Sequence, residues 1–294
     1  MSTSSNPSKL PQRDYGSTGV KLSIIGFGGL LVSGIEQAQA NRLVAESVER
    51  GVTYFDVAPT YGNAEERLGP ALEPWRKGVF LACKTTERTR AGAAAELQRS
   101  LERLRTGHVD LYQLHALTDV AKDVDVAFGK GGAMEAVLEA RKDGRVRFVG
   151  FSAHSVEAAL AAMDRFNFDS VLFQVNYACW LKGDYGPQIM RKAREKGAAR
   201  LALKALARQK WPKDDPDRAL HPKCWYQPVA DPYEADLALR FTLGQPITAA
   251  IPPGEEKLFR LALDIASRCR ALSPDEEREV QSLAAQMDPL FEAR

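Results

Sequence analysis

Four ionisable side chains stand at or shortly after the ends of predicted β-strands in this sequence, and their types suit the transfer of a proton. They are Asp56, Tyr61, Lys84 and His115. A tyrosine is a poor acid at neutral pH unless a nearby cation such as Lys84 favours its phenolate. Asp56 would keep Lys84 charged, and His115 would donate a hydrogen bond to a substrate oxygen. Such a set could protonate an alkoxide as it forms.

Proton transfer alone does not complete a reaction, and the sequence shows no serine or cysteine with a paired base. Another group must therefore deliver the nucleophile, and hydride from a nicotinamide would complete the chemistry. Each residue also has a purely structural interpretation. Asp56 could cap the next helix with Tyr61 packed on it, Lys84 could be an ion-pair partner, and His115 could be an interior histidine.

The stretches around these residues predict a regular alternation of strands and helices. The predicted strands cover residues 24–29, 53–56, 79–84, 108–114, 146–151, 170–175, 200–206 and 247–251. The predicted helices cover residues 37–50, 64–75, 91–105, 133–142, 156–165, 188–196, 233–243 and 256–268. Eight strand–helix units in 294 residues predict an α/β fold, the (β/α)8 TIM barrel. A doubly wound sheet would normally open with GxGxxG, and the glycine-rich stretch 26–31 lacks the third glycine.

The rest of the chain completes a single predicted domain, residues 13–294. We expect a disordered tail at 1–12 and a β-hairpin at 13–23, where glycines flank Ser17 and Thr18. The regular repeat stops at a long loop, 208–232, whose aromatic residues either line a pocket or hold the loop in place. A terminal helix over 275–287 follows a capping box.

In a TIM barrel the carboxyl ends of the strands meet at one face, where catalysis takes place. Ser152 and Gln174 also stand at predicted strand ends, beside the four ionisable residues. Strands that served packing alone would end in apolar groups and would not bury this much charge. The joint pattern therefore favours a catalytic site over separate structural roles.

Composition and charge exclude several other classes of protein. A net charge of +2 argues against an obligate nucleic-acid-binding surface. The four cysteines are scattered without a CxxC pair, which fits a reducing compartment. The four histidines show neither HxH nor HExxH spacing, so a metal site and a metal-dependent hydrolase are disfavoured. No secretory signal or membrane-spanning run is visible, and we expect a cytoplasmic protein. No heptad or apolar patch predicts an oligomeric state.

Several motifs resemble those of the aldo-keto reductase family over about residues 13–268. They are Gly-Val-Thr-Tyr-Phe-Asp-Val-Ala-Pro-Thr-Tyr-Gly (51–62), Asp-Leu-Tyr-Gln-Leu-His (110–115), Gly-Phe-Ser (150–152), Gln-Val-Asn-Tyr (174–177) and Ile-Pro-Pro-Gly (251–254). The resemblance implies that Asp56, Tyr61, Lys84 and His115 form a catalytic tetrad with Tyr61 as proton donor. It also implies NAD(P)H-dependent reduction of a small carbonyl compound, an aldehyde or ketone, and makes the hairpin a plug under the barrel.

The same resemblance implies an NADP(H) cofactor, more than NAD(H), bound without a Rossmann domain. The implied cofactor contacts are Gly28, Gly29, Asp56, Ser152, Gln174, Leu203, Lys204, Gly254, Lys257 and Arg260. For the substrate pocket we expect Tyr177, Trp180, Trp225 and Tyr226. The sequence departs from the family at Leu203, where an aromatic platform is usual, and at the acidic pair Glu255 and Glu256. A catalytically weak nucleotide-binding sensor on the same fold is the alternative function.

Overall fold

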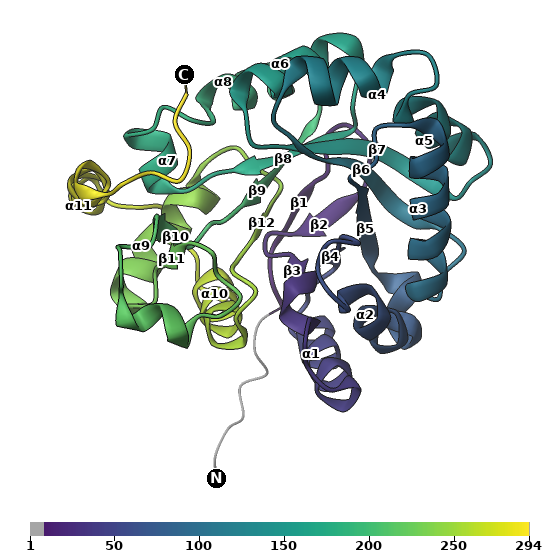
Figure 1. The fold of residues 1–294 in the computed structure, drawn as a ribbon. Coiled ribbons are helices and arrows are strands. Elements are labelled where there is room, and N and C mark those ends of the chain that lie inside the picture. The colour runs from purple at the N-terminus through teal and green to yellow at the C-terminus, as the bar shows by residue number, and fades with distance from the viewer. Residues whose placement is uncertain (1–8, 294) are drawn as a thin grey trace.

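The computed structural model describes residues 9–293, and within them eight parallel strands form a barrel (Figure 1). The strands are β3 (Phe27–Gly28), β4 (Tyr54–Asp56), β5 (Phe80–Thr85), β6 (Val109–Leu117), β7 (Val146–Ala153), β8 (Ser170–Gln174), β9 (Ala199–Leu203) and β12 (Ala249–Ile251). Their order in the sheet is β12-β9-β8-β7-β6-β5-β4-β3. A parallel bridge between Ile25 and Ala250 joins the two edges. The predicted TIM barrel is confirmed.

The helices surround the barrel (Figure 1), and their buried apolar side chains join those of the strands in one hydrophobic core. The longer ones are α1 (Gln37–Glu49), α2 (Ala64–Leu72), α3 (Arg90–Arg103), α5 (Ala133–Lys142), α6 (Val156–Arg165), α8 (Pro187–Glu195), α9 (Pro232–Gly244), α10 (Glu256–Ser267) and α11 (Pro274–Gln286). Several begin at side chains that accept a hydrogen bond from the first turn, such as Thr89 before α3 and Ser155 before α6. These local signals explain why most boundaries agree with the sequence-based prediction.

Some connections contain structure that the sequence pattern did not predict. They include the turn Gly29–Val32, the turn Glu73–Gly78, the helical turns Val120–Asp125 and α4 (Val126–Phe128), and the short helix α7 (Tyr177–Leu181). The predicted loop 208–232 contains a 3-10 turn, Pro216–Leu220, and its flanks pair as a small hairpin of β10 (Ala207–Gln209) and β11 (Gln227–Pro228). These elements are only two to six residues long, too short for a hydrophobic period to reveal them.

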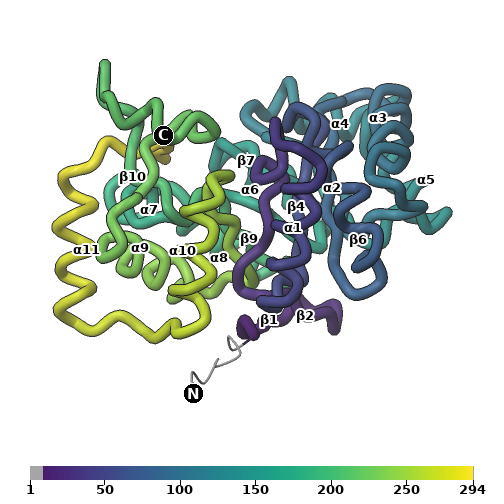
Figure 2. The backbone as a smooth tube through the Cα atoms, turned by 90° about the horizontal axis from the view of Figure 1, so that it is seen from below, coloured from purple at the N-terminus to yellow at the C-terminus, as the bar shows by residue number. Residues whose placement is uncertain are grey.

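The N-terminal hairpin closes one end of the barrel. Strands β1 (Gln12–Asp14) and β2 (Lys21–Ser23) pair in antiparallel fashion. They appear inside the ring in Figure 1 and at one end of the molecule in Figure 2. The buried Tyr15 ring lies 5.0 Å from Phe80 and 5.4 Å from Phe148, centroid to centroid. The predicted plug is therefore confirmed.

The predicted disordered tail 1–12 requires a correction at its end. Residues 1–8 lie outside the described part of the chain. Leu10, however, is buried, and its N–H donates to the carbonyl oxygen of Arg50. Gln12 belongs to β1. The apolar side chain of Leu10 packs into the hydrophobic core between the strands and the helices. The ordered domain therefore starts before residue 13.

The barrel interior contains an apolar layer above this hairpin. Its members share the inward face of the barrel strands and include Tyr54, Phe80, Ala82, Leu111, Phe148, Leu172, Leu201 and Ala249, with Leu22 of the hairpin packed against them. Because side chains alternate between the two faces of a strand, the residues two positions further along also point inward. The layer therefore determines which side chains reach the carboxyl ends of the strands.

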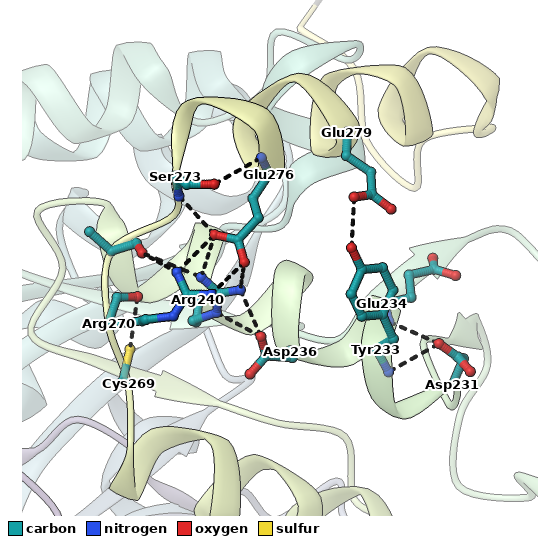
Figure 3. Close-up of polar contacts among 11 residues, drawn as sticks. Asp231, Tyr233, Glu234, Asp236, Arg240, Cys269, Arg270, Ser273, Glu276 and Glu279 are labelled. Carbon is teal, nitrogen blue, oxygen red and sulfur yellow. Dashed lines mark hydrogen bonds and ion pairs between the residues drawn. The ribbon is translucent and has the colours of Figure 1, made fainter.

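The C-terminal helix α11 is attached to α9 by a network of ion pairs, drawn in Figure 3. Arg240 on α9 donates to both carboxylate oxygens of Glu276, at 3.1 and 2.6 Å, and pairs with Asp236 at 2.7 Å. Arg270 binds the same Glu276 carboxylate from the exposed side. Glu276 also completes the predicted capping box with Ser273. The chain after α11 returns to the barrel, where the Phe291 ring lies 5.2 Å from that of His154.

None of the helices between residues 9 and 293 combines the length and the apolar character that a membrane crossing requires.

We expect Arg240→Met to lower the free energy of unfolding by about 1–3 kcal/mol, because Asp236 would lose its buried partner. The Arg240 side chain is only 3% exposed, whereas that of Arg270 is 61% exposed. Arg270→Met is the matched control and should cost much less. Urea denaturation of both variants measures the difference, and equal losses would contradict a dominant role for Arg240.

Candidate active site

Polar side chains form a second layer directly above the apolar layer of the barrel. Asp56 follows Tyr54 by two residues, Lys84 follows Ala82, and Gln113 follows Leu111. Strand register places Lys84 beside Gln113 and Asp56 beside Ala82. The period of two therefore turns these three polar side chains into the barrel, where they meet.

The centre of this layer is a buried ion pair between Lys84 and Asp56. The two side chains are 1% and 2% exposed, and Lys84 Nζ donates to Asp56 Oδ1. The other carboxylate oxygen accepts hydrogen bonds from Tyr54 Oη at 3.1 Å and Gln113 Nε2 at 3.0 Å. Burial lowers the pKa of Lys84, but the charge of Asp56 outweighs it and raises that pKa to about 12. Lys84 is thus held charged.

Tyr61 lies on the loop after β4, with its hydroxyl next to this ion pair. Lys84 Nζ lies 3.5 Å from Tyr61 Oη and 5.0 Å from the centre of the ring. Burial raises the pKa of Tyr61, while the charge of Lys84 acts in the opposite direction. Lys84 therefore has the expected effect, but the net shift is upward because burial is the larger cause. Tyr61 keeps its proton at neutral pH.

His115 faces Tyr61 from the end of β6. The two rings are 5.9 Å apart at an angle of 83°. Burial, reinforced by the charge of Lys84, lowers the pKa of His115 to about 2, so the imidazole is neutral. Its Nδ1 is buried and has no hydrogen-bond partner among residues 9–293. A neutral ring beside a protonated phenol can bind an oxygen without adding charge.

A cleft of about 220 Å³ opens onto these groups. Its lining includes Gly28, Asp56, Tyr61, Lys84, His115, Leu203, Lys204, Trp225, Tyr226 and Gly254, all of which the sequence analysis selected. It also includes six residues that were not predicted from the sequence, namely Leu30, His154, Lys223, Ile251, Pro252 and Pro253. Strand alternation could have indicated His154, two residues after Ser152. Lys223 lies in the irregular segment 208–232, where the sequence offers no such signal.

Two predicted cofactor contacts lie behind the cleft lining, fully buried in the barrel. Ser152 Oγ accepts a hydrogen bond of 2.7 Å from the N–H of Ala116, which leaves its hydroxyl hydrogen available. Both amide atoms of Gln174 lack a hydrogen-bond partner within the described chain. A buried amide without partners is costly unless a ligand satisfies it. These side chains fit a carboxamide such as that of nicotinamide.

The structure places the other two predicted cofactor cations away from the cleft lining among the described residues. Arg260 donates to Glu46 at 2.9 and 2.6 Å and pairs with Glu256 at 2.5 Å. Lys257 is exposed in the first turn of α10. Arg260 is directed to Glu46 because α1 and α10 are neighbours around the barrel (Figure 1). That long-range pairing is invisible in the sequence.

Tyr177 and Trp180 do not line the cleft in the part of the chain that the structure describes, contrary to the prediction. The chain turns into α7 directly after β8, and Tyr177 Oη donates to Glu234 on α9 at 2.7 Å. Trp180 packs close to Gly186. The short helix α7 thus directs both rings away from the cleft. Gly29 is also outside the cleft lining among the described residues, and a Cβ there would approach Val57 within 2.7 Å.

No group of three or more metal-ligating side chains occurs among residues 9–293.

The family model described as Aldo/keto reductase family matches residues 24–228. Uncharacterized oxidoreductase YqkF of Bacillus subtilis (strain 168) is 24% identical over 301 residues, spanning 92% of this chain and 95% of that protein. Aldo-keto reductase YhdN of the same organism is 30% identical over 159 residues, spanning 48% and 46% of the two chains.

Solved structures share the same fold. The holo form of aldo-keto reductase AKR11C1 from Bacillus halodurans aligns with a TM-score of 0.72 at 22% identity, covering 93% of this chain and 96% of that one. A thermostable aldo-keto reductase, Tm1743, in complex with the inhibitor epalrestat, aligns with a TM-score of 0.70 at 21% identity, covering 93% and 100%.

We expect Lys84→Met to lower the free energy of unfolding by about 3–5 kcal/mol, because it leaves the Asp56 carboxylate buried without a cation. The double variant Asp56→Asn/Lys84→Met should recover part of this loss, since an asparagine oxygen can still accept from Tyr54 and Gln113. Urea denaturation provides the measurement.

Lys210→Met is the control for this comparison, because the Lys210 side chain is 55% exposed in its pair with Asp288. It should cost less than about 1 kcal/mol. A Lys84 variant no less stable than the Lys210 variant would show that the buried pair does not hold the site together.

Proposed function

Because this chain belongs to the aldo-keto reductase family, we propose that it reduces an aldehyde or ketone to an alcohol with Tyr61 as proton donor. The observation that carries the proposal is the convergence of Tyr61, His115 and the Lys84–Asp56 pair on one cleft. Bound NAD(P)H would supply the hydride. Other chemistries that need a metal or a paired nucleophile find less support in these side chains.

The substrate oxygen would lie between Tyr61 and His115 in this mechanism. Tyr61 Oη and the neutral imidazole donate hydrogen bonds to the carbonyl, which orient it and stabilise negative charge as it develops. Tyr61 then transfers its proton to the alkoxide oxygen, and the ammonium of Lys84 at 3.5 Å stabilises the phenolate that remains. Asp56 keeps Lys84 charged and fixed in position. The upward pKa shift of Tyr61 ensures that the proton is present at neutral pH.

Residues around the cleft would hold the cofactor. We assign the nicotinamide carboxamide to Ser152 and Gln174, because Gln174 has an unused donor and acceptor. Leu203 would cover one face of the ring. Gly28 and Gly254 line the cleft without side chains, which allows a ligand to approach the backbone closely. Gly254 also precedes α10, whose free N–H groups suit a phosphate.

We expect NADP(H) to be preferred to NAD(H), with Lys223 and Lys257 near the 2′-phosphate. Lys223 lines the cleft next to Gly254, and its Nζ donates to the carbonyl of Leu31 at 3.0 Å. Its backbone N–H donates to Glu255 at 2.8 Å, which turns that acid toward the protein. Arg260 is excluded from this role by its pairing with Glu46 and Glu256.

Tyr61→Phe should lower kcat for carbonyl reduction by about 10²–10⁴-fold, because the variant lacks the transferable proton. The dissociation constant for NADPH should stay near the wild-type value, since the ring is retained. Stopped-flow or steady-state oxidation of NADPH with a panel of aldehydes measures kcat. Fluorescence titration measures the dissociation constant for NADPH.

Tyr177→Phe is the matched control for Tyr61→Phe. The Tyr177 hydroxyl is bonded to Glu234 outside the cleft, so its removal should leave turnover unchanged. Wild-type turnover in the Tyr61 variant would refute the assignment of the proton donor. NADPH binding without turnover in the wild-type protein would instead favour the sensor.

Gln174→Met should weaken NADPH binding about tenfold without lowering the free energy of unfolding, because its amide atoms have no partner in the protein to lose. Titration of NADPH and chemical denaturation measure the two effects. A loss of stability with unchanged affinity would make Gln174 a structural residue.

Titration with NADH provides the control, because the carboxamide is common to both cofactors. Gln174→Met should weaken the binding of NADPH and of NADH by the same factor, so that the ratio of their dissociation constants stays constant. That ratio in the wild-type protein measures the preference for the 2′-phosphate, and a ratio favouring NADH would overturn the NADP(H) assignment.

A further inference from the structure

Lys204 is a buried lysine in the cleft with no carboxylate partner. Its side chain belongs to the cleft lining although the residue is only 9% exposed. Within residues 9–293 its ammonium makes no ion pair and no hydrogen bond. By contrast, the other buried lysine, Lys84, is neutralised by Asp56. Burying a charge without a counter-charge costs free energy, which indicates that this ammonium has a function.

The ammonium lies beside two aromatic rings from distant parts of the chain. Lys204 Nζ is 5.4 Å from the centre of the Trp225 ring and 5.5 Å from that of Phe291. These cation–π contacts stabilise the ammonium but leave its charge uncompensated. His154, which also lines the cleft, packs against Phe291 and makes no side-chain hydrogen bond among the described residues. Lys204 and His154 are therefore both free to bind a ligand.

The backbone at Lys204 is unusual for a residue with a side chain. Its φ is +58°, in the left-handed region, immediately after β9 ends at Leu203. Its carbonyl oxygen accepts from the N–H of Ala207, which closes a tight turn. Such a conformation is uncommon for residues other than glycine and is one of the forms of backbone strain that cluster at functional sites, although Arg105, Ala116, Asp184 and Asp214 also have positive φ. The turn also explains why the strand predicted over 200–206 stops early.

The cleft as a whole carries positive charge. Among its described lining residues the acid Asp56 is balanced by Lys84, which leaves Lys204 and Lys223 in excess. Lys204 and His154 share the cleft lining with the proton-transfer residues Tyr61 and His115. Lys223 and Gly254 form the side assigned above to the cofactor. A substrate anion would therefore meet Lys204 and His154.

We propose that Lys204, assisted by His154, binds a carboxylate on the carbonyl substrate, so that oxo-acids are the preferred substrate class. The proposal rests on the reductase function proposed above. The ammonium and the imidazole N–H donate to the carboxylate oxygens, while Tyr61 and His115 hold the carbonyl group. The burial of Lys204, which is 9% exposed, strengthens this charge-assisted contact.

The test compares oxo-acids with their neutral methyl esters. Glyoxylate, 4-oxobutanoate and 4-carboxybenzaldehyde differ in the distance between carbonyl and carboxylate, and each is paired with its ester. In the wild-type protein at least one acid should exceed its ester about tenfold or more in kcat/KM. Lys204→Met should abolish that preference through a higher KM for the acid, while it changes kinetics with the ester much less.

Lys210→Met, which removes an exposed lysine a few residues away, is the control and should keep the preference. Equal losses of kcat/KM for the acid and its ester in Lys204→Met would show that Lys204 is only a structural support for Trp225 and Phe291. A weaker affinity for NADPH in that variant would assign the ammonium to a cofactor phosphate instead. The absence of any acid preference in the wild type would also overturn the proposal.

A binding measurement separates this proposal from the proposed function. Isothermal titration of the NADPH-saturated protein with benzoate and with neutral benzamide requires no turnover. Benzoate should bind at least about tenfold more tightly than benzamide, and Lys204→Met should remove the difference. If no carbonyl compound is reduced but benzoate still binds through Lys204, the reductase assignment fails and the anion site stands. Equal binding of the two compounds refutes the anion site, whatever the enzyme reduces.

Discussion

The buried ion pair of Lys84 and Asp56 is the interaction on which the site depends. Two charges with 1% and 2% exposure are stable only if each remaining polar atom has a partner. Tyr54 and Gln113 bind the second oxygen of Asp56, and the carbonyl of Val57 accepts from Lys84 at 3.3 Å. These contacts leave Lys84 Nζ a single direction in which to act, toward the hydroxyl of Tyr61. The geometry of the proposed proton transfer therefore follows from how the pair is stabilised.

The barrel makes this pair possible by dividing its interior into layers. The hairpin and the aromatic rings of Tyr15, Phe80 and Phe148 exclude water below the pair. Above it the cleft is open to ligands. The resulting low dielectric strengthens the electrostatic effect of Lys84 on its neighbours. The same burial raises the pKa of Tyr61 and lowers the pKa of His115. A protonated phenol and a neutral imidazole are the forms that a carbonyl group requires.

The outer wall of the cleft comes from the C-terminal half of the chain and depends on contacts far from the chemistry. The Arg240–Glu276 network fixes α11 to α9, and the segment after α11 brings Phe291 to Lys204 and His154. Trp225 reaches the same point from the irregular segment 208–232, with its ring 6.2 Å from Phe291. The residues proposed for proton transfer therefore lie on strand ends or the β4 loop, whereas those proposed to contact the rest of the substrate lie largely on connections.

The sequence by itself determined the barrel, its plug and the positions of Asp56, Lys84 and His115 at strand ends, with Tyr61 on the loop after β4. Strand alternation and strand–helix order are local patterns, and a barrel converts them directly into convergence at one face. Only the tertiary structure decided that Arg260 forms an ion pair with Glu46. It also decided that α7 directs Tyr177 and Trp180 away from the cleft. It also decided that Lys204 stays without a counter-charge. Such outcomes depend on which side chains from distant segments meet, and no local period of the sequence encodes that.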